Sequence, residues 1–256
     1  MGDSKLKIDI RREKILELLQ KTGRVSVSQL SRDLGATPVT IRSDLSALER
    51  DGYLSRVQGG AVSISRPNTP QNTAIANEAQ KQIIAESLAE KIQDGDTVFL
   101  NSGTTTLVAA RALKVRRGLY IVTNSLSVAL ELGAVPTFRV LLLGGEINAQ
   151  YAFTYGADAQ EQLRRYQAAW AVLSVDGVSC AGGITTYHAE EAIIDRMMLA
   201  QAKRIVIAAD SAKLGRTGFT QIAALTPDIH LLTDSGCPES VARELEQTGL
   251  SVEMCG

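Results

Sequence analysis

The stretch of residues 37–52 restricts the possible folds of this chain more than any other segment. Thr37 can cap a helix with its hydroxyl, and Pro38 suits the first helical position because the N–H that it lacks would be unpaired there. Apolar side chains then recur at helical spacing and form a single stripe, at Ile41, Leu45 and Leu48. Because such a stripe must pack against a core, the pattern predicts an amphipathic helix that stops at Gly52.

The opposite face of this helix carries short side chains and one guanidinium group: Val39, Thr40, Arg42, Ser43, Ser46 and Ala47. Short side chains let a helix backbone approach its partner closely, and the major groove of DNA admits a helix whose N-terminal residues reach base edges. An ordinary solvated helix surface has a similar composition, so this face alone leaves both interpretations open.

The preceding segments favour the DNA interpretation. A second amphipathic helix is expected over residues 25–34, and Gly35-Ala36 makes a tight turn from it into the helix described above. This is the spacing of a helix-turn-helix. A further helix is expected over residues 11–21, which would complete a three-helix core.

Residues 53–64 predict a hairpin wing beside these helices, because two β-prone runs flank Gln58-Gly59-Gly60. Residues 1–66 also carry twelve Lys and Arg against eight Asp and Glu, whereas the rest of the chain carries fifteen against twenty. A basic N-terminal segment can neutralise DNA phosphates, and an acidic remainder of the chain avoids non-specific binding to the same DNA. We therefore expect residues 1–64 to form a winged helix-turn-helix DNA-binding domain with these contacts: Thr37, Val39, Thr40, Arg42, Ser43, Ser46, Arg56 and Gln58.

Composition argues against several other classes of protein. Three cysteines, Cys180, Cys237 and Cys255, lack the spacing of a metal site, and their odd number favours reduced thiols. The N-terminus is charged, and no apolar run approaches the 18 or so residues of a membrane helix. We expect a cytoplasmic protein with no metal, no cofactor and no membrane partner.

The second domain is predicted to be α/β. Two prolines and no apolar residue in 65–72 are typical of a linker, so we place a linker at 65–75 and the second domain at 76–256. Short aliphatic runs then alternate with amphipathic ones, which indicates a doubly wound, largely parallel sheet. Strands are expected over 97–101, 119–123, 138–143, 169–175, 204–209, 229–233 and 250–254, and helices over 76–93, 105–113, 125–133, 157–166, 188–202 and 238–248.

Polar residues gather where the predicted strands end. Residues 101–106 (N-S-G-T-T-T) join a strand to a helix, and free N–H groups, the helix dipole and hydroxyls there could bind a phosphate or merely cap the helix. Four further strand ends carry Asn, Asp, Thr or Lys, and the pair Gly144-Gly145 follows a fifth predicted strand. Because ligands bind at the carboxyl edge of such sheets, we expect a pocket there. Asp176, Glu191 and Lys213 could in principle transfer protons, so an enzyme remains an alternative.

The ordered motifs resemble those of one family. Residues 25–62 are followed by N-S-G-T-T, T-N-S-L, G-G-E, D-G-V, G-G-I-T-T, A-E-E-A and A-A-D-S-A-K-L-G-R. Together they resemble the DeoR-type bacterial repressors of sugar metabolism over nearly the whole chain. This chain departs from the common family pattern at Asn101, where Asp is frequent, at Ser43, where Arg is frequent, and at Asn148, where a basic residue is frequent.

The resemblance implies a second domain related to ribose-5-phosphate isomerase and glucosamine-6-phosphate deaminase, kept as a sensor for a phosphorylated sugar and without catalysis. It implies that a phosphate is held by Ser102, Gly103, Thr104, Thr105 and Thr106. The residues expected around the sugar are Asn124, Gly145, Asp176, Thr185, Glu191 and Lys213.

The function expected from these residues and this resemblance is regulated binding to operator DNA. A sugar phosphate would tune or release a repressor of a carbohydrate-utilisation operon, and a homodimer or homotetramer would read paired half-sites. The alternatives are an active sugar-phosphate isomerase or deaminase with a DNA-binding head, an activator, and a second domain that only oligomerises.

Overall fold

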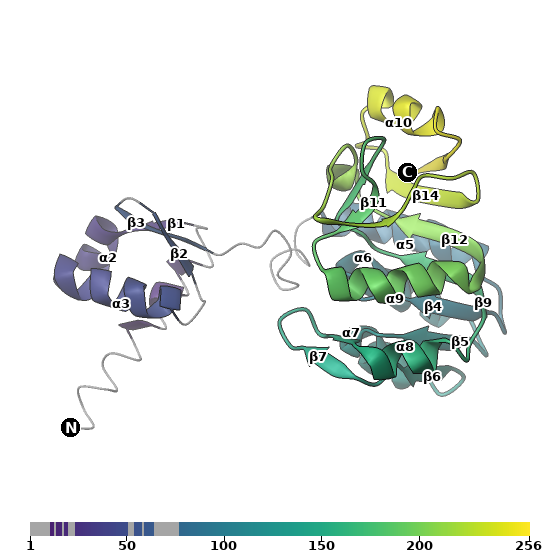
Figure 1. The fold of residues 1–256 in the computed structure, drawn as a ribbon, viewed down its shortest axis with the longest axis horizontal. Helices are drawn as coiled ribbons and strands as arrows, with labels where there is room; N and C mark the ends of the chain where they lie inside the picture. Colours follow the sequence, from purple (N-terminus) through teal and green to yellow (C-terminus); the bar gives the residue numbers. More distant parts are fainter. Residues whose placement is uncertain are drawn as a thin grey trace. The chain divides into compact units, whose positions relative to one another are not determined.

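The protein forms two compact units, Met1–Thr69 and Pro70–Gly256. The computed structural model describes residues 11–12, 14–16, 18–19, 24–50, 54–57, 59–63 and 77–256, so the expected linker at 65–75 lies outside the described residues. Figure 1 shows the elements of each unit. In these described ranges no helix has the length and apolar character needed to cross a membrane.

The N-terminal unit is a helix-turn-helix with a wing, as predicted. Its elements are β1 (Arg24–Ser26), α2 (Val27–Asp33), α3 (Pro38–Arg50), β2 (Leu54–Val57) and β3 (Gly60–Ser63), and the described residues between 11 and 19 are helical. The Ser26 hydroxyl caps α2 by accepting from the Gln29 N–H at 3.2 Å. The Thr37 hydroxyl caps α3 by accepting from the Thr40 N–H at 3.2 Å. The Thr37 cap thus fixes the start of α3, directly after the turn between the two helices.

The strand β1 was not expected, because we assigned Val25 and Ser26 to the start of a helix. It pairs antiparallel with β3, which in turn pairs with β2. A Cβ on Gly60 would lie 2.0 Å from the Val25 carbonyl oxygen, so only glycine allows this close pairing.

The core of this unit is small and aliphatic, and its largest members include Ile15, Leu30, Ile41, Leu45 and Leu54. The predicted stripe of α3 is buried as expected. Ala47 was expected on the open face but is only 5% exposed, because β2 of the wing packs against α3.

One buried charge joins α3 to the first helical segment. Asp44 is 3% exposed and lies in the middle of α3. Its carboxylate accepts from Arg11 Nε at 2.5 Å and from Arg12 Nε at 3.2 Å. These charge-assisted bonds compensate the burial of the carboxylate and fix the position of α3.

The second unit is built on a seven-stranded parallel sheet with the order β15-β14-β12-β9-β4-β5-β6. All seven strands were predicted, and they are β4 (Thr97–Leu100), β5 (Tyr120–Thr123), β6 (Arg139–Leu142), β9 (Ala168–Leu173), β12 (Ala202–Ala208), β14 (Ile229–Asp234) and β15 (Ser251–Cys255). Chain order reverses between β4 and β9, which confirms the doubly wound α/β class.

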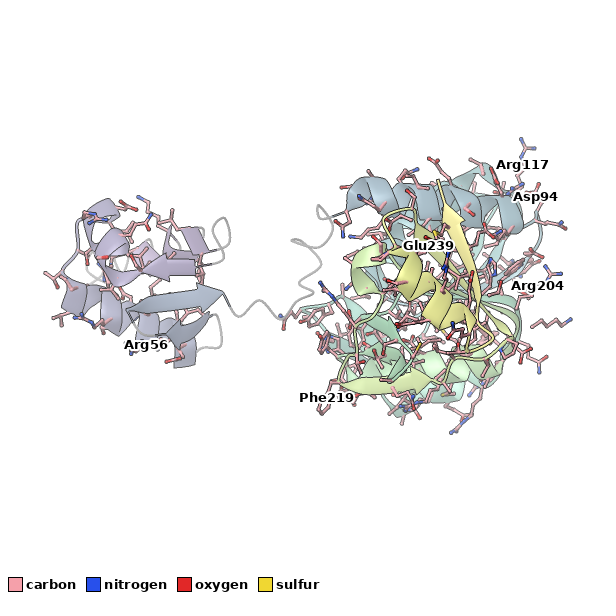
Figure 2. The ribbon with its side chains drawn as sticks, turned by 90° about the horizontal axis from the view of Figure 1, so that it is seen from above. Arg56, Asp94, Arg117, Arg204, Phe219 and Glu239 are labelled. Carbon is pink, nitrogen blue, oxygen red and sulfur yellow. The ribbon has the colours of Figure 1, made fainter. Side chains whose placement is uncertain are left out.

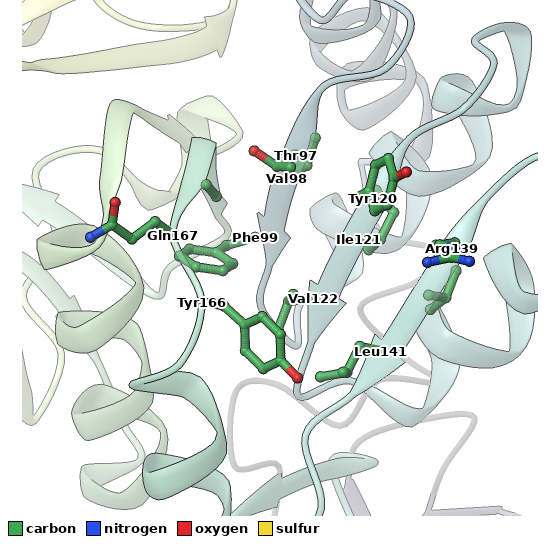
Figure 3. Close-up of a pocket in the computed structure, with 12 residues that line it drawn as sticks. Thr97, Val98, Phe99, Tyr120, Ile121, Val122, Arg139, Leu141, Tyr166 and Gln167 are labelled. Carbon is green, nitrogen blue, oxygen red and sulfur yellow. The ribbon is translucent and has the colours of Figure 1, made fainter.

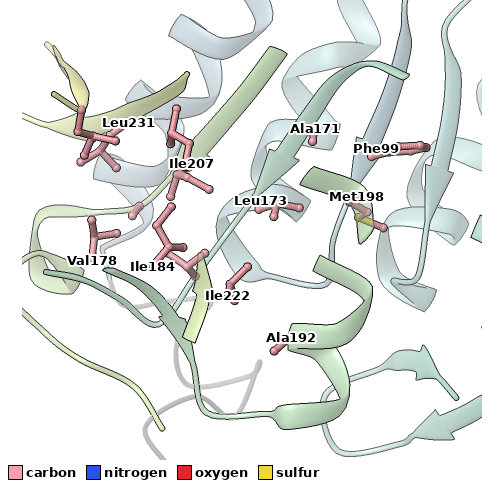
Figure 4. Close-up of a cluster of buried hydrophobic side chains, with 14 of the residues drawn as sticks. Phe99, Ala171, Leu173, Val178, Ile184, Ala192, Met198, Ile207, Ile222 and Leu231 are labelled. Atoms are coloured by element: carbon pink, nitrogen blue, oxygen red, sulfur yellow. The ribbon is translucent and has the colours of Figure 1, made fainter. Parts of the chain in front are cut away.

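Helices cover both faces of this sheet. One layer consists of α5 (Glu78–Lys91), α6 (Thr104–Ala112) and α7 (Leu126–Gly133), and the other of α8 (Ala157–Leu163), α9 (Ala189–Ala200) and α10 (Glu239–Glu246). All six begin and end within three residues of the predicted positions. Figure 4 shows the core of the second layer, where Leu173 and Ile207 of the sheet meet Ile184 and Met198.

Two small sheets were not predicted. They are β7 (Glu146–Asn148) with β8 (Phe153–Tyr155), and β10 (Gly177–Ser179) with β11 (Gly183–Thr186) and β13 (Thr220–Ala223). Strands of three or four residues are too short to show a period of two. Short 3-10 turns, η1 (Leu113–Val115) and η2 (Ser211–Lys213), complete the unit.

Asp44→Ala is expected to lower the unfolding free energy of the N-terminal unit by about 1 to 3 kcal/mol, because two charge-assisted hydrogen bonds are lost. Urea unfolding followed by far-UV circular dichroism measures this loss. Trp170, the single tryptophan, lies in β9 and reports the second unit separately by fluorescence. Asp33→Ala, at an exposed position of α2, is the control. Equal unfolding midpoints for the two variants would contradict the role of Asp44.

Candidate nucleic-acid interface and ligand site

The N-terminal half of α3 presents an open surface. Val39 is 73% exposed, and Arg42 and Ser43 are exposed as well, while Thr37 and Thr40 form the cap at the start of the helix. The first turn of α3 contains no acidic residue, so the positive end of its dipole is not offset by a carboxylate within that turn. A narrow, positively polarised helix end of this kind fits an anionic groove.

The wing supplies a second cation beside α3. Arg56 Nη1 donates to Ser46 Oγ at 2.9 Å, and the Arg56 N–H donates to Glu49 Oε1 at 2.8 Å. Arg56 is exposed at the surface of its unit (Figure 2). Gln58, the remaining expected DNA contact, lies outside the described residues.

In the second unit, Asn101 holds together the strand ends at which chain order reverses. Its side chain is fully buried at the end of β4. Its Nδ2 donates to the Ser174 carbonyl at 2.9 Å and to the Asp195 carboxylate at 3.1 and 3.2 Å, and its Oδ1 accepts from the Ser174 N–H at 2.9 Å. This amide therefore faces inward, and it fixes the loop that follows.

The loop at 102–104 begins α6. A Cβ on Gly103 would lie 2.4 Å from Ser174 Cβ, so glycine is required where the loop crosses β9. Thr106 closes the turn, because its hydroxyl lies 2.9 Å from the Gly103 N–H and 3.0 Å from the Asn101 carbonyl. Thr105 and Thr106 are buried, which leaves Ser102, Gly103 and Thr104 as the accessible part of the expected phosphate loop.

Carboxyl groups lie next to this loop. Glu191 and Asp195 lie one turn apart on α9, and the Ser102 hydroxyl donates to Glu191. The Thr186 hydroxyl lies 3.1 Å from Asp176 Oδ2 and 3.2 Å from Glu191 Oε2, so it can donate its proton to either. The loop after β4, the end of β9 and the start of α9 thus meet in one polar cluster.

Burial changes the acidity of this cluster. It raises the pKa of Glu191 to about 7, and the neighbouring charge of Asp176 adds to the effect. Burial and the charge of Glu191 also raise the pKa of Asp195 well above its usual value. The cluster consequently holds protons near neutral pH.

Lys213 borders the cluster, and its charge also acts on a second lysine, Lys81. Lys213 Nζ lies 3.5 Å from Asp176 Oδ1. Lys81, on α5, is 3% exposed, and burial lowers its pKa while the charge of Asp210 opposes that effect. Our sequence reasoning missed Lys81, although it occupies the same helical stripe as Ile84 and Leu88, and a lysine in a buried stripe is unusual.

The remaining expected residues have other surroundings. The Thr185 hydroxyl is used within the small sheet, where it donates to the Gly177 carbonyl at 3.1 Å and accepts from the Gly218 N–H at 2.7 Å. Gly145 lies in the turn before β7, where a Cβ would meet the Tyr155 carbonyl at 2.3 Å. Asn124 is fully buried, and its Oδ1 has no hydrogen-bond partner among the described residues. Three of the expected sugar contacts are linked to the loop. Lys213 pairs with Asp176, the Thr186 hydroxyl connects Asp176 to Glu191, and Glu191 accepts from Ser102 of the loop.

An apolar cavity of about 430 Å³ lies elsewhere on the sheet (Figure 3). Its lining includes Thr97, Tyr120 and Arg139, the first residues of β4, β5 and β6, together with Tyr166. It is therefore nearer the amino ends of the strands, away from the polar cluster. Across the described part of the chain, no three His, Cys, Asp or Glu side chains are grouped to hold a metal ion.

Comparison with known proteins gives matches over both units. Residues 11–67 match the family described as DeoR-like helix-turn-helix domain, and residues 76–235 match the DeoR C terminal sensor domain. The putative aga operon transcriptional repressor of Escherichia coli O157:H7 is 32% identical over 252 residues, which cover 96% of this chain and 93% of that protein. The glycerol-3-phosphate regulon repressor of Escherichia coli K12 is 29% identical over 247 residues, which cover 96% and 98%.

Among solved structures, ribose 5 phosphate isomerase A from Neisseria gonorrhoeae is similar with a TM-score of 0.40 and 16% identity. The matched region covers 57% of this chain and 54% of that chain.

The buried acids make stability depend on pH. Because the pKa of Glu191 is about 7 in the folded protein and 4.5 ordinarily, the folded state holds a proton between these pH values that the unfolded state releases. Stability is thus expected to fall as pH rises through this window. We expect the difference in unfolding free energy between pH 5.5 and pH 7.5 to be smaller for Glu191→Gln than for the wild type. Urea unfolding followed by Trp170 fluorescence measures this difference. Glu190→Gln, at an exposed position, should retain the full difference. An undiminished pH dependence in Glu191→Gln would contradict the assignment.

Proposed function

Because this chain belongs to the DeoR family of DNA-binding transcriptional regulators, we propose that it represses a carbohydrate-utilisation operon and that a phosphorylated sugar controls its affinity for the operator. The observation that carries this proposal is the similarity, over 96% of the chain, to a protein named as an operon repressor. The aga and glycerol-3-phosphate relatives are both named as repressors rather than enzymes, which disfavours an active isomerase or deaminase.

In this proposal residues 1–64 bind operator DNA in the cytoplasm. The start of α3 enters the major groove, and Arg42 and Arg56 contact base edges or phosphates. The exposure of Val39 and Arg42 and the anchoring of Arg56 on α3 support this arrangement. The full proposed set of contacts is Thr37, Val39, Thr40, Arg42, Ser43, Ser46, Arg56 and Gln58. A homodimer or homotetramer presents two such helices to paired half-sites.

Residues 76–256 act as the sensor domain. The phosphate binds at residues 102–104, where α6 begins, and the sugar hydroxyls bind to Asp176 and Glu191. Lys213 supplies a positive charge beside these carboxylates. The buried, unpartnered Oδ1 of Asn124 supports a polar ligand, since such atoms are costly when unpaired. The other proposed contacts are Thr105, Thr106, Gly145 and Thr185.

The ligand controls DNA binding only if it binds the DNA-competent state and another state with different affinities. A coupling free energy of about 1 to 3 kcal/mol changes the operator affinity about 5- to 150-fold. This range is sufficient for a switch between bound and released operator.

Arg42→Ala is expected to weaken binding to the operator about tenfold or more, because one contact to a base or phosphate is worth about 1 to 3 kcal/mol. Fluorescence anisotropy with DNA from upstream of the protein's own gene measures the dissociation constant across a salt series. Arg164→Ala, at the exposed position directly after α8, removes an equal charge elsewhere and should leave the affinity unchanged. Equal affinities for the two variants would exclude the proposed orientation of α3.

The effector is identified in the same assay with glucose 6-phosphate, fructose 6-phosphate, galactosamine 6-phosphate and glycerol 3-phosphate. One compound is expected to change the operator affinity at least fivefold. Lys213→Met should reduce this response, whereas Lys203→Met, at an exposed position, should not. Specific DNA binding that no phosphorylated compound alters, together with no binding of those compounds by calorimetry, would overturn the sensor proposal.

A further inference from the structure

Val39 is an apolar side chain in an unusual place. It is the second residue of α3, and 73% of its surface is exposed. Among the described residues of the N-terminal unit, it is the one large apolar side chain that lies on the surface. A β-branched residue also loses side-chain freedom in a helix, so neither core packing nor helix formation explains a valine at this position.

The hydroxyl groups on the same side of α3 already have partners within the protein. The Thr37 and Thr40 hydroxyls lie 2.9 Å apart, and the Thr37 hydroxyl also accepts from the Thr40 N–H as the helix cap. Two turns further along, Ser46 Oγ accepts from Arg56 Nη1 of the wing. These hydroxyls hold the helix and the wing in place, so base recognition depends more on the side chains between them.

The side chains between them form one compact surface. Val39, Arg42 and Ser43 are all exposed, and they lie three and four residues apart, which makes them neighbours on a helix. This surface combines methyl groups, a guanidinium and a hydroxyl. Each has its own partner in the major groove, where Arg pairs with guanine and an apolar group contacts the C5-methyl of thymine.

We propose that Val39 recognises the C5-methyl group of a thymine in the operator, about one or two base pairs from the base pair or phosphate that Arg42 contacts. This inference rests on the proposed DNA binding and names the base that one residue of the interface selects. The spacing follows from geometry, because the Cβ atoms are about 5 to 6 Å apart and base pairs follow one another about every 3.4 Å. Contact removes the methyl groups of valine and thymine from water together.

The same contact disfavours cytosine. Val39 offers neither a donor nor an acceptor, and a cytosine in place of the thymine would present its N4 amino group to the valine methyls. That amino group would lose water without gaining a partner. The valine therefore selects thymine both by attraction and by rejection of the competing base. Replacement of the thymine by cytosine is expected to weaken binding more than replacement by uracil.

The test removes the thymine methyl and the valine methyls separately and together. A footprint on DNA from upstream of the protein's own gene locates the bound segment, and each thymine in it is then replaced in turn by deoxyuridine. This replacement keeps the base pair and the O4 acceptor and removes only the methyl group. At one thymine of a half-site, it is expected to weaken binding of the full wild-type chain about fourfold, measured by fluorescence anisotropy. Val39→Ser should bind the thymine and uracil forms equally, because the partner of the methyl group is gone.

Arg42→Ala and Val39→Ile are the controls. Arg42→Ala should bind more weakly overall but keep the fourfold loss on uracil DNA, since its valine is unchanged, as estimated for one methyl group. Val39→Ile should also keep a loss on uracil DNA, because its side chain retains the apolar contact. These two variants distinguish loss of the methyl contact from a general weakening of binding.

Far-UV circular dichroism checks that the variants fold. Should the serine variant lose helix, Val39→Ala takes its place, because alanine has the highest helix propensity and also lacks the valine methyls. If no thymine methyl affects the wild type, or if Val39→Ser and Val39→Ala keep the full loss on uracil DNA, this inference is wrong and DNA binding by α3 stands. A wild type that binds no specific segment of this DNA would overturn the proposed function as well.

Discussion

The sensor unit depends on the junction that the Asn101 amide makes between β4 and β9. Chain order reverses between these strands, so the segments that follow them diverge. Asn101 joins the two strand ends with hydrogen bonds to the N–H and the carbonyl of Ser174 and to the carboxylate of Asp195. A carboxylate in this place could accept from the Ser174 N–H, but it could not donate to the carbonyl or to Asp195. The neutral amide is therefore what allows Asp195 to remain buried beneath the loop, and it explains why a departure from the common family residue is compatible with an intact site.

The polar cluster of the second unit contains several buried charged groups. Glu191 and Asp195 are buried beside the loop at 102–104, and Lys81 is buried beside Asp210. Each of these groups lowers the stability of the free protein relative to an apolar side chain of the same size. Such a loss of stability is typical of functional sites, where activity and stability are in conflict.

The N-terminal unit must hold α3 rigidly while leaving one face of that helix exposed. Its core is too small to fix α3 by apolar contacts alone. Asp44 attaches α3 to the first helical segment, and Arg56 and Glu49 attach the wing to it. The exposed residues at the start of the helix, Val39, Arg42 and Ser43, are consequently presented in a fixed orientation.

The sequence by itself determined the elements and their order. Thr37 and Pro38 fixed the start of α3, and aliphatic runs of four to seven residues marked all seven strands of the large sheet, because both signals depend on neighbouring residues only. It also placed Asp176 and Lys213 at one edge, since the carboxyl ends of parallel strands coincide, whereas Glu191 was expected there only from the family resemblance. Tertiary structure alone decided which polar atoms face each other. It buried Ala47 under β2, turned Asn101 inward, used Thr186 rather than Thr185 to join two carboxylates, and brought Lys81 to Asp210 across 129 positions of sequence. These contacts depend on how helices and strands pack, and no local pattern encodes that packing.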